Sequence, residues 1–509
     1  MSLREKIISL ISRYVLLPLV KLYVHIVKNP KTQEYFESNG ILYLGDVSSD
    51  YANDFLNGYG STEIWTKVYN RVKQTKADLA GCGFIGHNFI IPRKPSLIKS
   101  ILVKDASHFD RVHTMLSLKG DYIVSKSMVF MQGEDWKKTR AKFESAFTPS
   151  KVKRSFEQAN QLGKNLVAYL NRELDKDPEK GIDFRIAAHK FSLDAAGSST
   201  LNLDTASLQT RAPSQFEKIS AKFFLSFDSF ANWWKPGLIQ WFPRIATYFK
   251  LSVVDKEILQ FYGHVTRENM KNSGGDKNAN DFAGLVHSTW QELYGGHVDR
   301  PDQEEWITAN LFGMVLPGYK TTQTLIAMCA YVLALHQDVQ DKLRDEVNAM
   351  MESHGDEFTF AAVNEMTYIE MVINETLRIY SPVGLVGRMC RKEYAVPDTT
   401  LVLKVGDIIL ISLYGLHYDE EYHPNPEVFD PERFAGAKKD FTFLPFSEGP
   451  RNCIGIRMAL VQTKMMLCHV LKNFKLTPSP ETLIPMKFVK SAFPVMDTEE
   501  VIVCCTKIE

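Results

Sequence analysis

The sequence predicts a mainly α-helical protein with small β-sheets, and three features of the chain predict this class. Most of residues 134–350 shows the helical spacing of apolar side chains, interrupted by a polar surface loop at 273–281. Residues 305–336 are almost continuously apolar, which is typical of a helix buried through the middle of a molecule. Short runs of Val, Ile and Leu separated by Gly and Pro indicate small strands at 82–104, together with a helix, and at 392–413.

The composition is that of a large globular protein of a reducing compartment. The 509 residues are 45% hydrophobic and 24% charged, and 60 Lys and Arg balance 60 Asp and Glu. A chain without a basic surplus is not expected to bind nucleic acid, because nothing offsets the phosphate charge. Seven cysteines are too few for a disulfide scaffold, and a mean hydropathy of −0.18 excludes a protein with many membrane spans.

Residues 7–27 form a hydrophobic segment long enough to consider as a membrane span. Arg13, Lys21, His25 and a proline interrupt it, and charges near the centre of a span are costly. On a helix these basic side chains share one side, whereas Ile, Leu and Val occupy the other. This pattern favours an amphipathic helix that lies in the membrane interface. A helix that packs on the core, or that targets an organelle, is the alternative.

The sharpest chemical signal is the motif FSEGPRNCIG at 446–455, which contains Cys453. Gly449 and Gly455 indicate a tight loop, and Cys453 lies just before a strongly helical run. Backbone N–H groups at the start of a helix stabilise a thiolate, and Arg451 adds a positive charge nearby. Such a thiolate could serve as a nucleophile, a redox sensor or an axial metal ligand.

The same motif resembles the haem-binding signature of the cytochrome P-450 superfamily. The resemblance rests on Phe446, Gly449, Arg451, Cys453 and Gly455, which match fixed positions of that signature. It implies that the Cys453 thiolate is the proximal ligand of the iron in haem b. It also implies a fold in which haem lies between a long central helix and the loop and helix that carry the cysteine. Residues 1–28 are then a membrane-associating helix, and 29–509 a single catalytic domain.

Two further motifs agree with this resemblance. NETLRIYSP at 374–382 contains Glu375 and Arg378, which match the ExxR pair of the family, and PERF at 431–434 contains Arg433. By resemblance these three residues form a buried ion triad that holds the loop before the ligand. Taken alone, an ExxR pair would more often be a surface salt bridge.

The resemblance also assigns contacts to the haem propionates. Trp136 and Arg140 lie four residues apart in GEDWKKTR, and with Arg388 and Arg451 they are the expected partners of the propionates. Two buried carboxylates need such cations to offset the loss of water. His417 is expected to be structural.

The supporting strings resemble the microsomal animal group, which contains vertebrate drug-metabolising and insect detoxification enzymes. Such relatives are monooxygenases that receive NADPH-derived electrons through a diflavin reductase, with cytochrome b5 as a further partner. The expected substrate is an apolar small molecule: a lipid, a terpenoid or steroid, or a xenobiotic. The expected location is the cytoplasmic face of the endoplasmic reticulum membrane, in preference to mitochondria. Residues 116–131 and 222–234 are expected either to line an apolar pocket or to be plain core or membrane-dipping surface.

The chain departs from the family pattern in its central helix. Gly318 and Thr321 are present, and Thr321 is expected to be the hydroxyl on the dioxygen side. The usual acid, however, is replaced by Lys320, and Pro317 stands where a small residue is usual and should bend the helix. A charged ammonium cannot accept a proton, so the ordinary acid–alcohol relay is missing.

Three interpretations of this departure remain open. Water and Thr321 can suffice for a monooxygenase, and Lys320→Asp should then tighten the coupling of NADPH use to product. The enzyme could instead act without oxygen, as an isomerase or dehydratase on a peroxide-type substrate. A haem protein that binds ligands as a sensor, without turnover, is the third interpretation.

Overall fold

The computed structural model describes residue 18 and residues 29–508, except for 113–119, 178–179, 202, 204, 211, 229–238, 240–241, 273–281, 295–302, 437–439, 490 and 492–494. Except for residue 18, the segment 7–27, and with it the helix expected within 1–28, lies outside the described residues, as does the loop at 273–281. Among the helices that are described, none is both long enough and apolar enough to cross a membrane.

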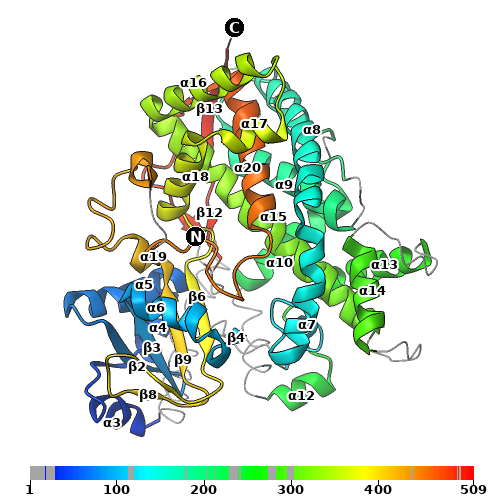
Figure 1. Cartoon of the computed structure of the whole chain (residues 1–509). Helices are drawn as coiled ribbons and strands as arrows, with labels where there is room; N and C mark the ends of the chain where they lie inside the picture. Colours follow the sequence, from blue (N-terminus) through cyan, green and yellow to red (C-terminus); the bar gives the residue numbers. More distant parts are fainter. Residues whose placement is uncertain are drawn as a thin grey trace.

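The described chain is mainly helical: α3 to α6 lie around the main sheet, and most of the longer helices lie above it and to its right (Figure 1). The longer helices are α4 Ser48–Leu56, α5 Ser61–Gln74, α7 Gly133–Phe143, α8 Pro149–Leu174, α9 Phe184–Leu201, α10 Gln215–Asp228, α13 Lys256–Asn272, α14 Phe282–Tyr294, α15 Gln303–Leu335, α16 Gln337–Ser353, α18 Tyr368–Ile379 and α20 Ile456–Asn473. The shorter ones are α3 Lys31–Glu37, α6 Pro95–Lys99, α12 Pro243–Tyr248, α17 Phe360–Glu365 and α19 Leu413–His417, with a 3₁₀ turn at Pro431–Phe434.

The main sheet has the strand order β1-β2-β3-β9-β6-β4. Its strands are β1 Tyr43–Asp46, β2 Leu79–Phe84, β3 His87–Pro92, β9 Ile408–Ser412, β6 Leu385–Met389 and β4 Arg111–Val112. A second sheet joins β10 Phe474–Pro478, β13 Ile502–Lys507 and β5 Ile182–Asp183, and two small ladders pair β7 Tyr394–Ala395 with β8 Val402–Leu403 and β11 Phe488–Val489 with β12 Asp497–Thr498. The mainly α class with small sheets is therefore confirmed.

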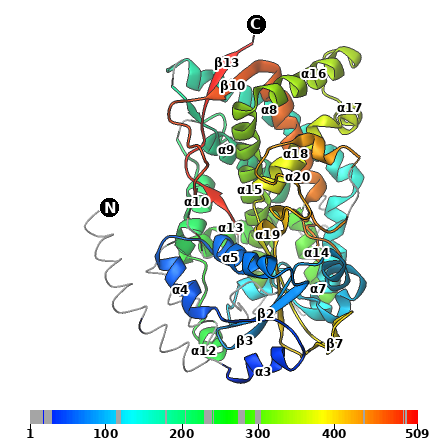
Figure 2. The ribbon, with the colours of Figure 1, turned by 90° about the vertical axis from the view of Figure 1, so that its left-hand side faces the viewer.

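The helix α15 runs through the middle of the molecule, and the other long helices pack around it (Figure 2). It packs most extensively on α9 and also on α13, α14, α18 and α20. Its apolar side chains are buried along nearly the whole length, which explains why the sequence at this position is hydrophobic on all sides. The helix continues through Pro317, although proline cannot donate the usual backbone hydrogen bond at that point.

Candidate active site

A cavity of about 520 Å³ lies between α15 and the loop 445–455 that leads into α20. One wall consists of α15 residues from Phe312 to Leu325, and a second wall comes from β6 and the chain before it. The third wall is the loop that contains Cys453. From the segment 116–131, Val124 and residues 127–130 line the cavity, whereas most of 222–234 lies outside the residues whose side chains are described. The lining is largely apolar.

Cys453 lines this cavity, and the residue as a whole is exposed to it. The backbone N–H of Cys453 donates to the carbonyl of Phe446 at 3.0 Å, which closes the loop, and Gly455 caps the start of α20. Burial among the walls raises the thiol pKa above its ordinary value, while the backbone N–H of Gly455 and the charge of Arg140 act in the opposite direction. The backbone N–H of Gly455 therefore favours the thiolate as the sequence predicted, the favourable charge comes from Arg140 and not from Arg451, and desolvation is the larger effect on the free thiol.

Gly449 makes the tight loop possible. Its φ of +79° lies in the left-handed region, and a Cβ at this position would lie 1.8 Å from the carbonyl oxygen of Leu102. Any larger residue would push the loop away from the segment 100–104. The glycine therefore fixes the approach of the cysteine loop to the rest of the fold.

Two guanidinium groups near the loop, Arg388 buried and Arg451 half-buried, form no ion pair within 4 Å with a described carboxylate, although the charge of Asp110 acts on Arg451 from farther away. Arg388, on β6, donates to the hydroxyl of Ser447 at 3.3 Å and to the carbonyl of Gly387, and burial lowers its pKa to about 10. Arg451 donates to the carbonyls of Asp110 and Met131. Burial, followed by repulsion from Arg388, lowers the pKa of Arg451 to about 9. Both side chains line the cavity, so the region is prepared for an anion.

Trp136 and Arg140 project from one face of α7 toward the same loop. The Arg451 guanidinium lies 3.6 Å from the centre of the Trp136 ring, within the range of a cation–π contact. Arg140 donates to the backbone carbonyl and the side-chain oxygen of Asn452, each at 2.9 Å, and it also pairs with Glu144. Arg140 thus holds the residue next to Cys453 in place.

The face of α15 that borders the cavity contains Pro317, Gly318 and Thr321. Pro317 and Gly318 are exposed in the middle of an otherwise buried helix, and a Cβ added to Gly318 would meet nothing within 4 Å. The Thr321 hydroxyl donates to the carbonyl of Pro317 at 2.6 Å and leaves its lone pairs free to accept a hydrogen bond. This face of α15 therefore presents small side chains and the Thr321 hydroxyl to the cavity.

Lys320 does not stand alone at the position of the usual acid. Its ammonium lies 2.6 Å from the carboxylate of Asp497 on β12, and the residue is only 6% exposed. Among the described residues that line the cavity, none is Asp or Glu. The described part of this wall therefore offers the Thr321 hydroxyl and, next to it in sequence, the Lys320 ammonium, but no carboxylate.

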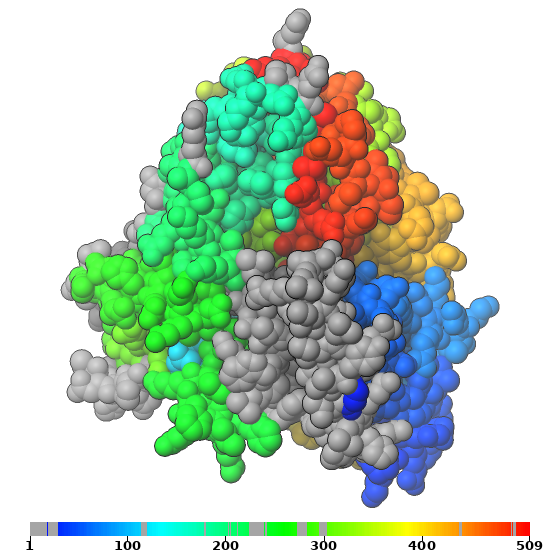
Figure 3. All heavy atoms as spheres, turned by 180° about the vertical axis from the view of Figure 1, so that it is seen from behind, coloured from blue at the N-terminus to red at the C-terminus, as the bar shows by residue number. Residues whose placement is uncertain are grey.

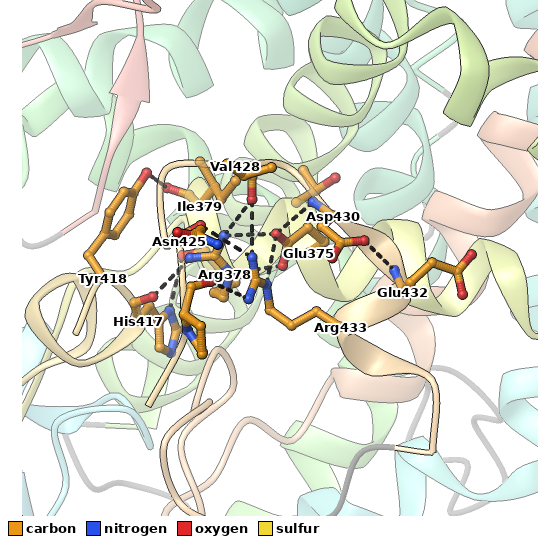
Figure 4. A network of polar contacts seen from close by, with 12 residues as sticks. Glu375, Arg378, Ile379, His417, Tyr418, Asn425, Val428, Asp430, Glu432 and Arg433 are labelled. Carbon is orange, nitrogen blue, oxygen red and sulfur yellow. Dashed lines mark hydrogen bonds and ion pairs between the residues drawn. The ribbon is translucent and has the colours of Figure 1, made fainter. Parts of the chain in front are cut away.

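Glu375, Arg378 and Arg433 are brought together, as Figure 4 shows. Arg378 donates twice to the Glu375 carboxylate at 2.8 Å, and both side chains are fully buried. The Arg433 Nε lies 3.4 Å from the same carboxylate. A bidentate pair of this kind offsets the loss of water around both charges. Arg378 and Arg433 also donate to the backbone carbonyls of residues 417, 424, 425 and 428, so the triad holds the segment 417–428 in place.

His417 connects the triad to the cysteine loop. Its Nδ1 lies 3.3 Å from the carbonyl of Arg378, and its Nε2 accepts the backbone N–H of Leu444 at 3.0 Å. Since Nε2 accepts, the imidazole is neutral and Nδ1 carries the proton. Burial, followed by the positive potential of His423 and Arg378, lowers the pKa of His417 to about 3. The ring lies outside the cavity lining and acts as a structural link, as expected.

We predict that His417 makes the protein sensitive to acid. The native pKa lies below the unfolded value of 6.5, so the unfolded chain takes up this proton first as the pH falls. Stability should fall between pH 6.5 and about 3, by at most about 1.4 kcal/mol per pH unit for this one group. Urea unfolding at pH 7, 6 and 5 should show a shallower pH slope for His417→Asn than for the wild type. Parallel pH slopes would contradict this assignment.

The chemistry of this donor set fits the haem that the resemblance implies. Cys453, which lines the cavity, can bind iron as a thiolate, and the buried Arg388 and half-buried Arg451, whose desolvation disfavours their charges, suit anionic partners. The propionates of haem are such anions. The open space at Gly318 leaves room above a flat group on the α15 side.

Some residues of the site had no signal in the sequence. Asp497 lies 177 residues from Lys320 along the chain, and nothing in its local sequence distinguishes it. Asn452 lies within the motif but was not singled out, although it accepts both hydrogen bonds from Arg140. Only tertiary structure brings these partners together.

Comparison with known proteins supports the same interpretation. A family model described as "Cytochrome P450" matches residues 55–505. Cytochrome P450 9e2 of Blattella germanica is 30% identical over 460 residues, which cover 84% of this chain and 84% of that protein. Cytochrome P450 3A31 of Mesocricetus auratus is 32% identical over 409 residues, covering 78% of each chain. Cytochrome P450 6j1 of Blattella germanica is 27% identical over 504 residues, with 96% of each chain covered.

Proposed function

This chain belongs to the cytochrome P450 family, and from that premise we propose that it inserts one oxygen atom into an apolar small molecule bound between α15 and the Cys453 loop. The family resemblance and the fold class that the sequence predicted are confirmed, and the protein is a monooxygenase enzyme. Its cofactor is haem b, and its electrons come from NADPH through a reductase. The class of substrate, the roles of individual residues and the cellular location are proposals.

The residues that would hold the haem are the cysteine and the two arginines that line the cavity beside the ligand loop. The Cys453 sulfur would bind the haem iron as a thiolate, and Arg388 and Arg451 would pair with the propionates, with the Arg451 guanidinium over the Trp136 ring. Arg140 acts mainly through Asn452, by keeping the ligand loop in position. Haem with a thiolate ligand supplies the activation of dioxygen, of which one atom enters the substrate and the other is reduced to water.

The chain itself contributes positioning, exclusion of water and a proton near the reacting atoms. Apolar side chains of α15 and β6 exclude water from around the substrate. Gly318 has no side chain, so it leaves space beside the helix where the substrate must approach. Thr321 holds a hydroxyl proton toward the Pro317 carbonyl and can turn it into the cavity. With no carboxylate on the described lining, water and Thr321 carry the protons.

One observation carries this proposal: Cys453, two arginines (Arg388 and Arg451) and an apolar wall that contains Thr321 surround the same cavity. The test is turnover of apolar probes, such as a steroid, a terpene and a fatty acid, with NADPH, a diflavin reductase and ¹⁸O₂. We expect at least one product to gain a single ¹⁸O atom. Products that gain only oxygen from water, or no product from any probe, would contradict the proposal.

The missing carboxylate favours a second candidate, which is rearrangement of a peroxide-type substrate without dioxygen. The Lys320 ammonium and Thr321 can steady the oxygens of a peroxide, and such a reaction does not need a carboxylate to relay protons. Isomerisation or dehydration of a lipid hydroperoxide in the absence of NADPH would favour this candidate. Ligand binding with no reaction under either condition would favour a sensor.

We also place the enzyme at the cytoplasmic face of the endoplasmic reticulum membrane, with cytochrome b5 as a further partner. Around α12, Phe242, Ile245, Tyr248 and Phe249 are about half exposed or more, and Tyr248 reaches 82%. The green atoms of the α12 segment project at the lower edge of the molecule in Figure 3, and α3, which follows the hydrophobic segment 7–27, lies at the same end as α12 in Figures 1 and 2. An exposed apolar group of this kind suits a membrane surface. Flotation with phospholipid vesicles should weaken in the Tyr248→Ser, Phe249→Ser variant, and Ile186→Ser on α9 is the control.

A further inference from the structure

The ion pair between Lys320 on α15 and Asp497 in the C-terminal segment has no role in the proposed monooxygenase chemistry. Lys320 borders the cavity, whereas Asp497 is not among the residues that line it. The ammonium is nearly buried, and the carboxylate retains 22% of its side-chain exposure. An ammonium taken out of water needs a counter-charge, so the position of Asp497 and that of the lysine depend on each other.

Three more contacts fix the segment that carries Asp497. The Thr324 hydroxyl, one helical turn beyond Lys320, donates to the carbonyl of Met496 at 3.4 Å. The backbone N–H of Met496 donates to the carbonyl of Pro382 at 2.8 Å, and Val495 forms an isolated bridge with Val383. The segment 495–498 is therefore attached both to α15 and to the chain that leads into β6.

This attachment matters to the cavity because Val495 is part of its wall. Val495, Pro382 and Val383 all line the cavity, and Val495 lies only two residues from Asp497. A shift of β12 away from α15 would move Val495 with it. Since the wall is apolar, its position decides which apolar ligands fit and how they lie.

We propose that the Lys320–Asp497 ion pair is a clamp that fixes Val495 in the cavity wall and so determines which apolar ligands the site accepts. The clamp rests on the proposed function only in that the cavity binds an apolar molecule beside the haem. Lys320 and Asp497 are positioning residues, because they act through Val495 and do not take part in proton transfer.

This geometry changes the expectation for Lys320→Asp as a single variant. The sequence alone predicted tighter coupling of NADPH use to product. In the structure, an aspartate at 320 would face the Asp497 carboxylate, and two like charges at this distance repel each other. The double variant Lys320→Asp, Asp497→Lys restores the opposite charges with their positions exchanged, so it tests the clamp more cleanly.

The experiment compares the wild type, both single variants and the double variant as haem-loaded full chains. Spectral titration uses two probes that bind haem iron: imidazole, which is small, and clotrimazole, an imidazole that bears three aromatic rings. We expect the Kd for clotrimazole to rise about tenfold in each single variant and to return within about twofold of wild type in the double variant. The Kd for imidazole should stay unchanged. Hydrogen exchange at residues 495–498 should follow the same pattern, faster in the single variants and restored in the double.

Equal Kd values for clotrimazole in all four proteins, or a double variant no better than the worse single one, would overturn the clamp. Lys320→Met removes the buried charge and leaves Asp497 access to water, so it provides a folded variant if the charge changes prevent haem loading. We expect it to weaken clotrimazole binding and to leave imidazole binding intact. Neither readout requires turnover, so failure of the monooxygenase assay and failure of the clamp are distinguishable.

Discussion

Replacement of Cys453 with Ser is expected to abolish the long-wavelength Soret band of the reduced carbon monoxide complex and to reduce monooxygenase activity below detection. A serine hydroxyl stays protonated where a thiol can bind iron as a thiolate, and thiolate donation is what favours O–O cleavage. The loop should keep its shape, because Cys453 closes it through a backbone hydrogen bond to Phe446. Difference spectroscopy and product analysis measure the two effects.

The matched control is Cys504→Ser, because Cys504 lies on β13 and is not among the residues that line the cavity. This variant should retain both the band and the activity. A normal band in the Cys453→Ser variant would mean that another residue ligates the iron, and the assignment of Cys453 would be wrong.

Glu375→Gln is expected to destabilise the fold by about 3–5 kcal/mol, since it leaves the buried charge of Arg378 without its partner. The glutamine amide also directs N–H donors at a guanidinium that itself only donates. A loss of this size is a large part of the stability of a typical protein, so less folded holoprotein should accumulate. Urea unfolding monitored by circular dichroism gives the free energy of unfolding for both proteins.

Glu268→Gln on α13 is the control for this chemistry. Glu268 forms an exposed pair with Lys271, with 45% of its side chain accessible, and exposed pairs of this kind contribute little to stability. The control should unfold at the urea concentration of the wild type. A Glu375→Gln protein as stable as the wild type would show that the triad does not hold the loop.

The sequence predicted the parts of the site that are encoded locally. The conformation of the cysteine loop depends on turn residues and a helix start within ten positions, so a single local motif is enough to predict it. The pairing of Glu375 with Arg378 needs only one helical turn. The central helix could be identified because a helix buried on all sides is apolar on all sides, and 305–336 corresponds to Gln303–Leu335.

The parts that could not be predicted depend on distant segments. Whether Lys320 is buried and paired depends on β12, which the sequence places near the other end of the chain. The pKa of Cys453 depends on how far α15 and β6 exclude water, and no local motif reports this. The backbone N–H at the start of α20 lowers the thiol pKa as expected, but desolvation raises this pKa by more. The helix also continues through Pro317 because packing along α15 compensates for one missing hydrogen bond.

The most direct test of a haem-thiolate monooxygenase is the carbon monoxide difference spectrum of the purified protein, with NADPH and a diflavin reductase as the only reductant. We expect a long-wavelength Soret band, which would show thiolate ligation by Cys453 and electron transfer from a reductase together. A band seen only with a chemical reductant would contradict the proposed electron path and favour the oxygen-independent or sensor interpretation. No long-wavelength band under either reductant would contradict Cys453 as the thiolate ligand, and with it the proposed function.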